Sequence, residues 1–180
     1  MMSQQRKTRG RVTNGMVALA LALAALGVRP ADADSGQGHP ARQLEGAWYV
    51  LVSRTDCQTG AVLPGPAIPA LLTFARGGTM TDSSGSPPPG FAPSQRSIGL
   101  GNWRHDRART FTASTFMLIH FDSPAGSSPP GFLAGSQTIT QEITLTDVDR
   151  FTAVASTQFF NTAGQQYRAG CSTAAGQRLP

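Results

Sequence analysis

Eight short segments rich in Thr, Val, Ile and Phe follow one another after residue 44, each separated from the next by turn-forming residues. Short β-rich segments at this spacing are typical of an antiparallel sandwich or barrel. Their β-branched residues and Gly/Pro punctuation argue against helices. The sequence therefore predicts an all-β domain over residues 44–180, folded as a single eight-stranded antiparallel up-and-down barrel. The expected strands span residues 46–56, 70–76, 79–84, 97–106, 109–121, 135–147, 150–160 and 165–175.

Apolar and polar side chains alternate along the longest of these segments. Because successive side chains of a strand point to opposite faces, a period of two predicts one packed face and one face that is wet or lines a cavity. The segment over 109–121 places on a single face Phe111, Ala113, Thr115, Met117, Ile119 and Phe121. The segment over 135–147 places on one face Ile139, Ile143 and Leu145 with Gln137 and Gln141. The segment over 150–160 places on one face Phe151, Ala153, Ala155, Thr157 and Phe159.

Short connectors alternate with long ones along the chain. The short ones lie at Gly77-Gly78, 106–109 and 147–149, and the long ones at 57–69, 85–96 and 122–134. In an up-and-down meander, successive connections alternate between the two ends of the barrel. The three long connectors are therefore predicted to share one rim, and the tight turns to share the other.

Two of the long connectors have similar sequences. Phe91 and Phe132 each follow a Pro-Pro-Gly run, and Ser-Gln follows shortly after each Phe, at 94–95 and at 136–137. The two Phe side chains are either aromatic flaps at an open rim or plugs that complete the core.

Cys57 and Cys171 are the two cysteines of the chain. Cys57 follows the first predicted strand and Cys171 lies in the last. These strands are neighbours only if the barrel closes, and closure makes a normal Cα separation for a disulfide feasible. We therefore expect one bridge between them. Two free thiols or a metal site are the alternatives, and a pair without suitably spaced His residues is a poor zinc site.

The first 33 residues have the features of a secretory signal peptide. A basic stretch over residues 6–11 precedes an uncharged apolar run over 16–28, and Ala31-Asp32-Ala33 supplies the small residues of a cleavage site. The run is shorter than the roughly 20 apolar residues of a spanning helix. We expect residues 1–33 to be removed, leaving a flexible leader over 34–43 and a periplasmic or extracellular barrel. A core helix of a cytosolic protein is the alternative interpretation.

Removal of this peptide changes the charge of the chain. The full sequence carries +5, whereas from Asp34 onward ten Arg face nine acidic residues, a net of +1. The basic excess belongs to the targeting segment, so nucleic acid is not an expected partner. Nor do we expect the processed protein to span a membrane. An outer-membrane barrel needs an outward apolar band with aromatic girdles, and here Thr, Ser and Gln fill one face.

The predicted barrel resembles the lipocalins and the wider calycin group, as a small secreted bacterial protein of that type. Gly46-x-Trp48 opens the first strand, as the G-x-W motif does in that family, and Thr146-Asp147-Val148 sits where lipocalins carry T-D-Y. The resemblance implies that Trp48 closes the narrow end of the barrel and that an Arg from the C-terminal region stacks on it. Arg178 is the nearest candidate and Arg168 the second.

If the interior is hollow, its walls come from inward-facing residues of the middle strands. Eight strands leave room for a side-chain core or for one small ligand, so a filled barrel is the alternative. His120, beside a long connector, is a titrating group that could orient a ligand at the rim. The predicted ligand-binding residues are Trp103, Phe111, Met117, Gln137, Gln141 and Phe159 inside, with His120, Phe91 and Phe132 at the rim.

Three functions fit these features. The first is non-enzymatic binding of a small apolar ligand that enters past the long connectors. The second, by analogy with barrel enzymes of cyclase or isomerase type, is catalysis with His120 or Glu142 as acid–base. The third is a protein-interaction surface formed by the Pro-Gly-Phe connectors. The sequence contains no catalytic motif, phosphate loop or metal-ligand cluster, so we expect no cofactor and no metal, and it indicates no oligomeric state.

Overall fold

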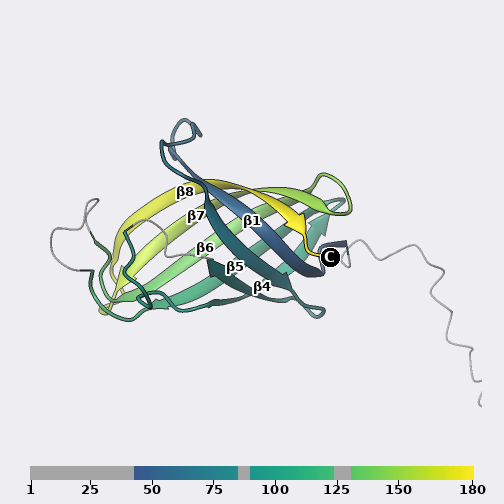
Figure 1. Ribbon diagram of the computed structural model, residues 1–180. Coiled ribbons are helices and arrows are strands. Elements are labelled where there is room, and N and C mark those ends of the chain that lie inside the picture. The colour runs from purple at the N-terminus through teal and green to yellow at the C-terminus, as the bar shows by residue number, and fades with distance from the viewer. Residues whose placement is uncertain (1–42, 85–89, 124–130) are drawn as a thin grey trace, which may run out of the picture. The chain divides into compact units, whose positions relative to one another are not determined.

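The computed structural model describes residues 43–84, 90–123 and 131–180, and these residues form a closed antiparallel barrel (Figure 1). Each strand pairs with the next along the chain, and the last pairs with the first, so the sheet has no free edge. The predicted all-β, up-and-down barrel is confirmed. The strands are β1 (Gly46–Thr55), β2 (Ile68–Phe74), β3 (Thr79–Ser84), β4 (Gly99–Arg107), β5 (Thr110–Ile119), β6 (Gly135–Leu145), β7 (Arg150–Asn161) and β8 (Gln166–Arg178).

Seven of the strands agree with the predicted segments to within two residues, and β8 is the exception. β2 begins earlier than predicted because Pro69 does not break it and pairs with Leu51 of β1. β8 continues to Arg178 because Gly176 gives room to the neighbouring strand: a Cβ there would lie 2.3 Å from the Phe151 ring. The predicted signal peptide (1–33) and nearly all of the predicted leader (34–43) lie outside the described residues.

Apolar side chains pack inside the barrel, as the alternation predicts. In β5, buried and more exposed positions alternate from Phe111 to Ile119. Phe121, which was predicted on the same face, is instead 41% exposed, because β5 ends at Ile119 and the pleat stops there. The larger of two buried clusters includes Trp48, Phe74, Trp103, Phe111, Ile143, Leu145 and Phe151.

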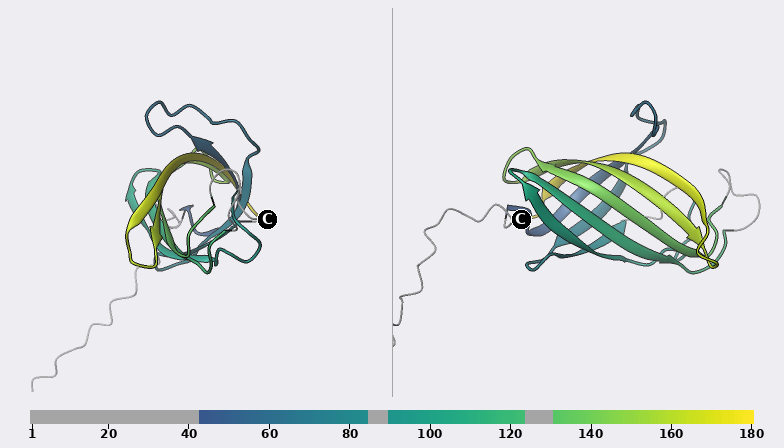
Figure 2. Two further views of the ribbon diagram at one scale, coloured as in Figure 1. Left: turned by 90° about the vertical axis from the view of Figure 1, so that its left-hand side faces the viewer. Right: turned by 180° about the vertical axis from the view of Figure 1, so that it is seen from behind.

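The two ends of the barrel differ as the connector lengths predict (Figure 2). The β1–β2, β3–β4 and β5–β6 connections are long and share one end, which we call the loop end. Tight turns join the strands at the other end, which we call the turn end. In the β2–β3 turn, Gly77 and Gly78 have φ angles of +92° and +89°, a region that favours glycine.

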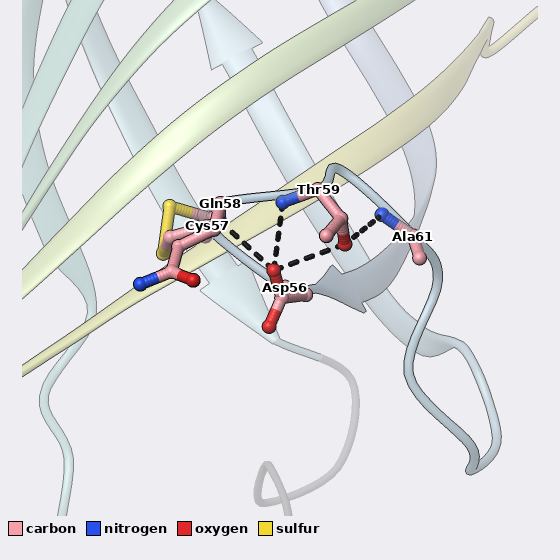
Figure 3. The surroundings of a disulfide bond; sticks show 6 residues. Asp56, Cys57, Gln58, Thr59 and Ala61 are labelled. Atoms are coloured by element: carbon pink, nitrogen blue, oxygen red, sulfur yellow. Dashed lines mark hydrogen bonds between the residues drawn. A yellow bond between two sulfur atoms is a disulfide. The ribbon is translucent and has the colours of Figure 1, made fainter.

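Cys57 and Cys171 form a disulfide at the loop end, and the predicted bridge is confirmed (Figure 3). Their Cα atoms lie 5.2 Å apart, because Thr55 of β1 is paired with Cys171 of β8. Beside the bridge, the Asp56 carboxylate accepts hydrogen bonds from the N–H and hydroxyl of Thr59 and from the N–H of Gln58. These hydrogen bonds, led by the Thr59 N–H, lower the pKa of Asp56. The bridge thus fixes the start of the β1–β2 connector to the last strand.

Trp48 and Arg178 close the turn end. The Trp48 side chain is fully buried, and its Nε1 donates a hydrogen bond to the carbonyl of Leu44. The Arg178 guanidinium lies 4.3 Å from the centre of the Trp48 ring and donates to the carbonyls of Glu45 and Val148. The stacking Arg that the resemblance implies is therefore Arg178. Arg168 lies against a different ring.

Candidate functional site

A cavity of about 410 Å³ lies inside the barrel. It exists because β7 and β8 place small residues on their inner faces, among them Ala155, Gly170 and Ala174. A side chain added at Gly170 would meet nothing within 4 Å of its Cβ. Small-molecule sites typically have volumes of about 300–1,000 Å³, so this cavity has the size of a site for a small ligand. Much of its remaining wall is aliphatic, from Val50, Val52, Leu72 and Ile139.

Bulky aromatic side chains fill the interior towards the turn end. Trp48 packs on Phe151 with ring centres 4.9 Å apart, and Trp103 packs on Phe74 and Phe111 at 6.0 and 5.9 Å. The Trp103 Nε1 donates to the carbonyl of Ala75, so the indole is held at the β2–β3 turn. The barrel is therefore filled in one part and hollow in another, which combines the two alternatives left open by the sequence.

A buried ion pair lies in the cavity wall. Arg96, in the β3–β4 connection, faces Asp82 of β3 at 3.5 Å, and only 8% and 10% of the two side chains are exposed. The Nε of Arg96 also donates to the Gln137 amide oxygen of β6, at 2.7 Å. Burial raises the pKa of Asp82, and the charge of Arg96 opposes that shift. The guanidinium thus connects β3 to β6 across the interior.

Gln141 presents its side-chain amide to the cavity without a hydrogen-bond partner among the described residues. It lies four residues before the end of β6, between Ala113 and Ala155 of the neighbouring strands, and is 7% exposed. Its side chain lines the cavity and makes no hydrogen bond to any of the residues that the structure describes. Among the described residues, the buried side-chain atom without a hydrogen-bond partner is the Oγ1 of Thr115, so the amide of Gln141 is open to the cavity. Gln141 is therefore placed to hydrogen-bond a polar group inside the cavity.

An aromatic cluster covers part of the cavity at the loop end. The rings of Phe91 and Phe132 stack with centres 3.9 Å apart and planes 5° from parallel. Phe132 also packs on Phe159 of β7 at 4.8 Å, and Ile119 and Tyr167 complete the cluster. We call these five residues the aromatic cap. Because Phe91, Phe132 and Phe159 also line the cavity, the two Pro-Gly-Phe connectors turn their rings inward, as plugs would.

Gln95 and Ser123 hold the two connectors of the aromatic cap together. Gln95 is fully buried, and its amide nitrogen donates to the carbonyls of Phe121 and Phe132. Its amide oxygen accepts from the N–H of Ala92 and from the Ser123 hydroxyl. Sequence reasoning missed this role, although the repeated Ser-Gln pair was a signal: Gln95 and Gln137 both prove to be buried and hydrogen-bonded.

Two arginines contribute to the cavity wall at the loop end. Arg54, at the end of β1, is exposed and donates to the carbonyl of Pro64 in the β1–β2 connector. Arg168 of β8 lies with its guanidinium carbon 4.4 Å from the centre of the Phe132 ring. Leu63 and Cys171 also line the cavity here, so the connector held by the disulfide forms part of the rim.

The predicted ligand-binding residues fall into two groups. Phe91, Phe132, Gln137, Gln141 and Phe159 line the cavity together. The others lie outside its lining: Trp103 and Phe111 belong to the filled part, Met117 is fully buried near Gly99, and His120 is exposed just beyond β5.

Glu142, the other proposed acid–base residue, is exposed on the outer face of β6, whose inner face carries Gln141. Neither Glu142 nor His120 belongs to the residues that line the cavity.

No group of three or more His, Cys, Asp or Glu side chains within the described ranges could hold a metal ion. No helix within those ranges is long and apolar enough to cross a membrane. Comparison with known proteins finds no matching family model, no matching curated protein and no matching solved structure.

Proposed function

We propose that this chain is an exported, lipocalin-like barrel that binds one small, mostly apolar molecule without transforming it. The observation that carries the proposal is the cavity of about 410 Å³, whose wall is largely aliphatic and aromatic with a few polar groups. Natural small-molecule sites have this composition: an apolar enclosure with a small number of placed hydrogen-bonding groups. Gln141 supplies such a group.

Two further features support this assignment. The disulfide between Cys57 and Cys171 fits an oxidising compartment, as expected for a protein with an N-terminal secretory signal. The arrangement of Gly46, Trp48 and Arg178 at the turn end is the one that the resemblance to lipocalins implies. We place the protein in the periplasm or outside the cell on these grounds.

The geometry gives less support to the other two functions. An acid–base role for His120 or Glu142 would need one of them in the cavity, and both are exposed outside its lining. A docking surface built on Phe91 and Phe132 would need their rings outward, and the rings stack on each other and on Phe159 instead.

The test is a titration with N-phenyl-1-naphthylamine, a neutral fluorophore whose emission rises in apolar surroundings. The purified protein is compared with Gly170→Leu, which fills the cavity where an added side chain meets nothing. Ala175→Leu on the exposed face of β8 is the matched control. We expect the wild type and Ala175→Leu to bind the fluorophore with the same affinity. Gly170→Leu should bind it about tenfold more weakly, because the leucine side chain takes space that the bound fluorophore needs, and such overpacking costs about 1–3 kcal/mol. Absence of binding to the wild type, or equal binding to Gly170→Leu, would refute the proposal.

A further inference from the structure

A row of small and polar residues runs across the inner face of β6, β7 and β8. Gln141 of β6 is paired with Ala155 of β7, and Ala155 is paired with Ser172 of β8. All three residues line the cavity, so their side chains point to the same face of the sheet. Ala155 projects only a methyl group, and the wall is therefore low between the Gln141 amide and the Ser172 hydroxyl.

The two polar groups of this row have no hydrogen-bond partner among the described residues. Gln141 is 7% exposed, and its amide is open to the cavity. The Ser172 hydroxyl likewise makes no hydrogen bond within the described ranges. Both groups are uncharged, and each can donate as well as accept a hydrogen bond. They therefore complement a ligand group that also donates and accepts, as a hydroxyl does.

The spacing of the strands allows one ligand group to contact both residues. Neighbouring strands lie about 4.8 Å apart, so about 10 Å separates the Cα atoms of Gln141 and Ser172 across β7. Two hydrogen bonds of about 2.8 Å each cover about half of that distance, and the two side chains cover the remainder. A hydroxyl over Ala155 is thus within reach of both polar groups.

This row lies where the cavity meets the filled part of the barrel. Along β6 and β7, the next inward-facing residues towards the turn end are Ile143 and Ala153, and both belong to the larger apolar cluster. Towards the loop end the space is open, because a Cβ added at Gly170 of β8 would meet nothing within 4 Å. A ligand can therefore place a polar group against Gln141 while its body extends towards the loop end.

We infer that the bound molecule is a neutral, apolar compound with a hydroxyl group, which binds over Ala155 between Gln141 and Ser172. This inference rests on the proposed function and narrows it to one class of ligand. The hydroxyl gives up its hydration inside the barrel, and hydrogen bonds to the amide and to the serine replace that hydration. The apolar body lies in the open space beside Gly170, against the aliphatic and aromatic wall.

The experiment compares competitors that differ in one group. 4-Butylphenol and 4-butyltoluene have the same shape, with a hydroxyl in the first where the second has a methyl, and 4-butylbenzoate carries a negative charge instead. Each competitor displaces N-phenyl-1-naphthylamine from the wild type, Gln141→Leu, Ser172→Ala and the matched control Gln158→Leu, whose substitution lies on the exposed face of β7. At about pH 7.5 the phenol is neutral, because its pKa is about 10. Near-UV circular dichroism checks the fold of each variant.

We expect the wild type to bind the phenol at least as tightly as the toluene. A hydroxyl that entered the cavity without a partner would lose its hydration, and the phenol would then bind about tenfold more weakly than the toluene. Gln141→Leu should weaken phenol binding about fivefold to tenfold and Ser172→Ala about threefold, while toluene binding stays within about twofold. Gln158→Leu should bind both competitors as the wild type does.

Three outcomes would overturn the inference. If the fluorophore binds but the ratio of phenol to toluene affinity is the same in the wild type and in Gln141→Leu, the hydroxyl site is wrong and the apolar binding function stands. Tighter binding of the benzoate than of the phenol to the wild type would indicate an anionic ligand instead, and this comparison needs no substitution. If the fluorophore does not bind the wild type, the proposed function itself fails, and the inference fails with it.

Discussion

Gly46 leaves the space that the guanidinium of Arg178 occupies. A Cβ at position 46 would lie 2.7 Å from an Nη of Arg178, and Gly46 has a φ of +128°. Both the backbone conformation and the contact therefore require glycine. The first residue of the G-x-W motif permits the stacking of Arg178 on its third residue, Trp48.

We predict that Gly46→Ala lowers the free energy of unfolding by about 2–3 kcal/mol, because it combines backbone strain with displacement of Arg178. Gly60→Ala is the control, since Gly60 has a φ of +73° and an added Cβ would meet nothing within 4 Å. Urea denaturation of both variants measures the additional cost at position 46, which combines the contact with Arg178 and a φ further from the left-handed helical region than that of Gly60. Equal losses in the two variants would mean that the contact with Arg178 contributes nothing.

The pair of Asp82 and Arg96 leads to a pH-dependent prediction. Arg96→Met leaves a buried carboxylate without its cation and should cost about 3–5 kcal/mol at about pH 7.5. Burial already raises the pKa of Asp82, and loss of the cation raises it further. When the pKa of a carboxyl group is higher in the folded protein than in the unfolded chain, the protein loses stability as the pH rises from the unfolded pKa to the folded pKa. The variant should therefore recover stability when the pH is lowered.

Unfolding of the wild type and Arg96→Met at about pH 4.5 and about pH 7.5 measures this difference. The double variant Asp82→Asn/Arg96→Met has no carboxyl at this position and should show a much weaker pH dependence than Arg96→Met. A loss of the same size at both pH values in Arg96→Met would contradict the prediction.

The disulfide allows a prediction about closure of the barrel. Cys57 and Cys171 are separated by 114 residues, and cross-linking a loop of this length restricts the unfolded chain by about 4–5 kcal/mol in the chain-entropy description. We expect Cys57→Ser/Cys171→Ser to lose stability of that order while keeping its strand content, because β1 and β8 remain hydrogen-bonded. Circular dichroism followed through urea unfolding tests both parts. Loss of the β spectrum without denaturant would show that the pairing of β1 with β8 depends on the bridge.

The stacked pair in the aromatic cap can be measured by a double-mutant cycle. Phe91→Ala and Phe132→Ala should be coupled by about 0.5–1.5 kcal/mol, because stacked rings contribute this much beyond their buried area. Phe91→Ala combined with Phe151→Ala at the turn end should be additive, since residues in separate clusters do not share contacts. An additive Phe91/Phe132 pair would mean that the stacking has no energetic effect.

Much of the fold could be predicted from the sequence because it depends on local patterns. Alternation fixes the inner faces of β5 to β7, and the order of connector lengths places the long loops at one end. Cys57 and Cys171 test closure because they lie in the first and last parts of the barrel. The small residues of β7 and β8 were also visible, as a run of Ala, Gly and Ser at alternate positions.

The cavity itself was harder to predict, because alternation determines the direction of a side chain and not its height along the barrel. Trp103 and Phe111 point inward as expected, but they pack in the filled part. Asp82 and Arg96 meet from different parts of the chain, and isolated charges in a sequence are ordinarily assigned to the surface. His120 follows the last residue of β5, where the alternation no longer applies.

Two glutamines on the inner face of β6 should respond in opposite directions to the same substitution. Gln137 accepts a hydrogen bond from Arg96 at 2.7 Å, whereas Gln141 has no partner among the described residues, and the two are 6% and 7% exposed. Gln137→Leu removes a partner of a buried cation and should lower the free energy of unfolding by about 2–3 kcal/mol. Gln141→Leu replaces an amide that is open to the cavity and has no hydrogen-bond partner among the described residues with an apolar side chain in a largely apolar wall, and should raise it by up to about 1 kcal/mol.

Urea unfolding of the two variants measures the sign directly, and their similar burial makes each the control for the other. Retention of a residue that costs stability is expected at binding sites, where a group is held ready for a ligand. A gain in Gln141→Leu, together with weaker binding of ligands that carry a hydroxyl or carbonyl group, would therefore identify this amide as part of the recognition site. A loss in Gln141→Leu as large as that in Gln137→Leu would instead mean that the amide is already satisfied in the unliganded protein, by water or by residues outside the described ranges.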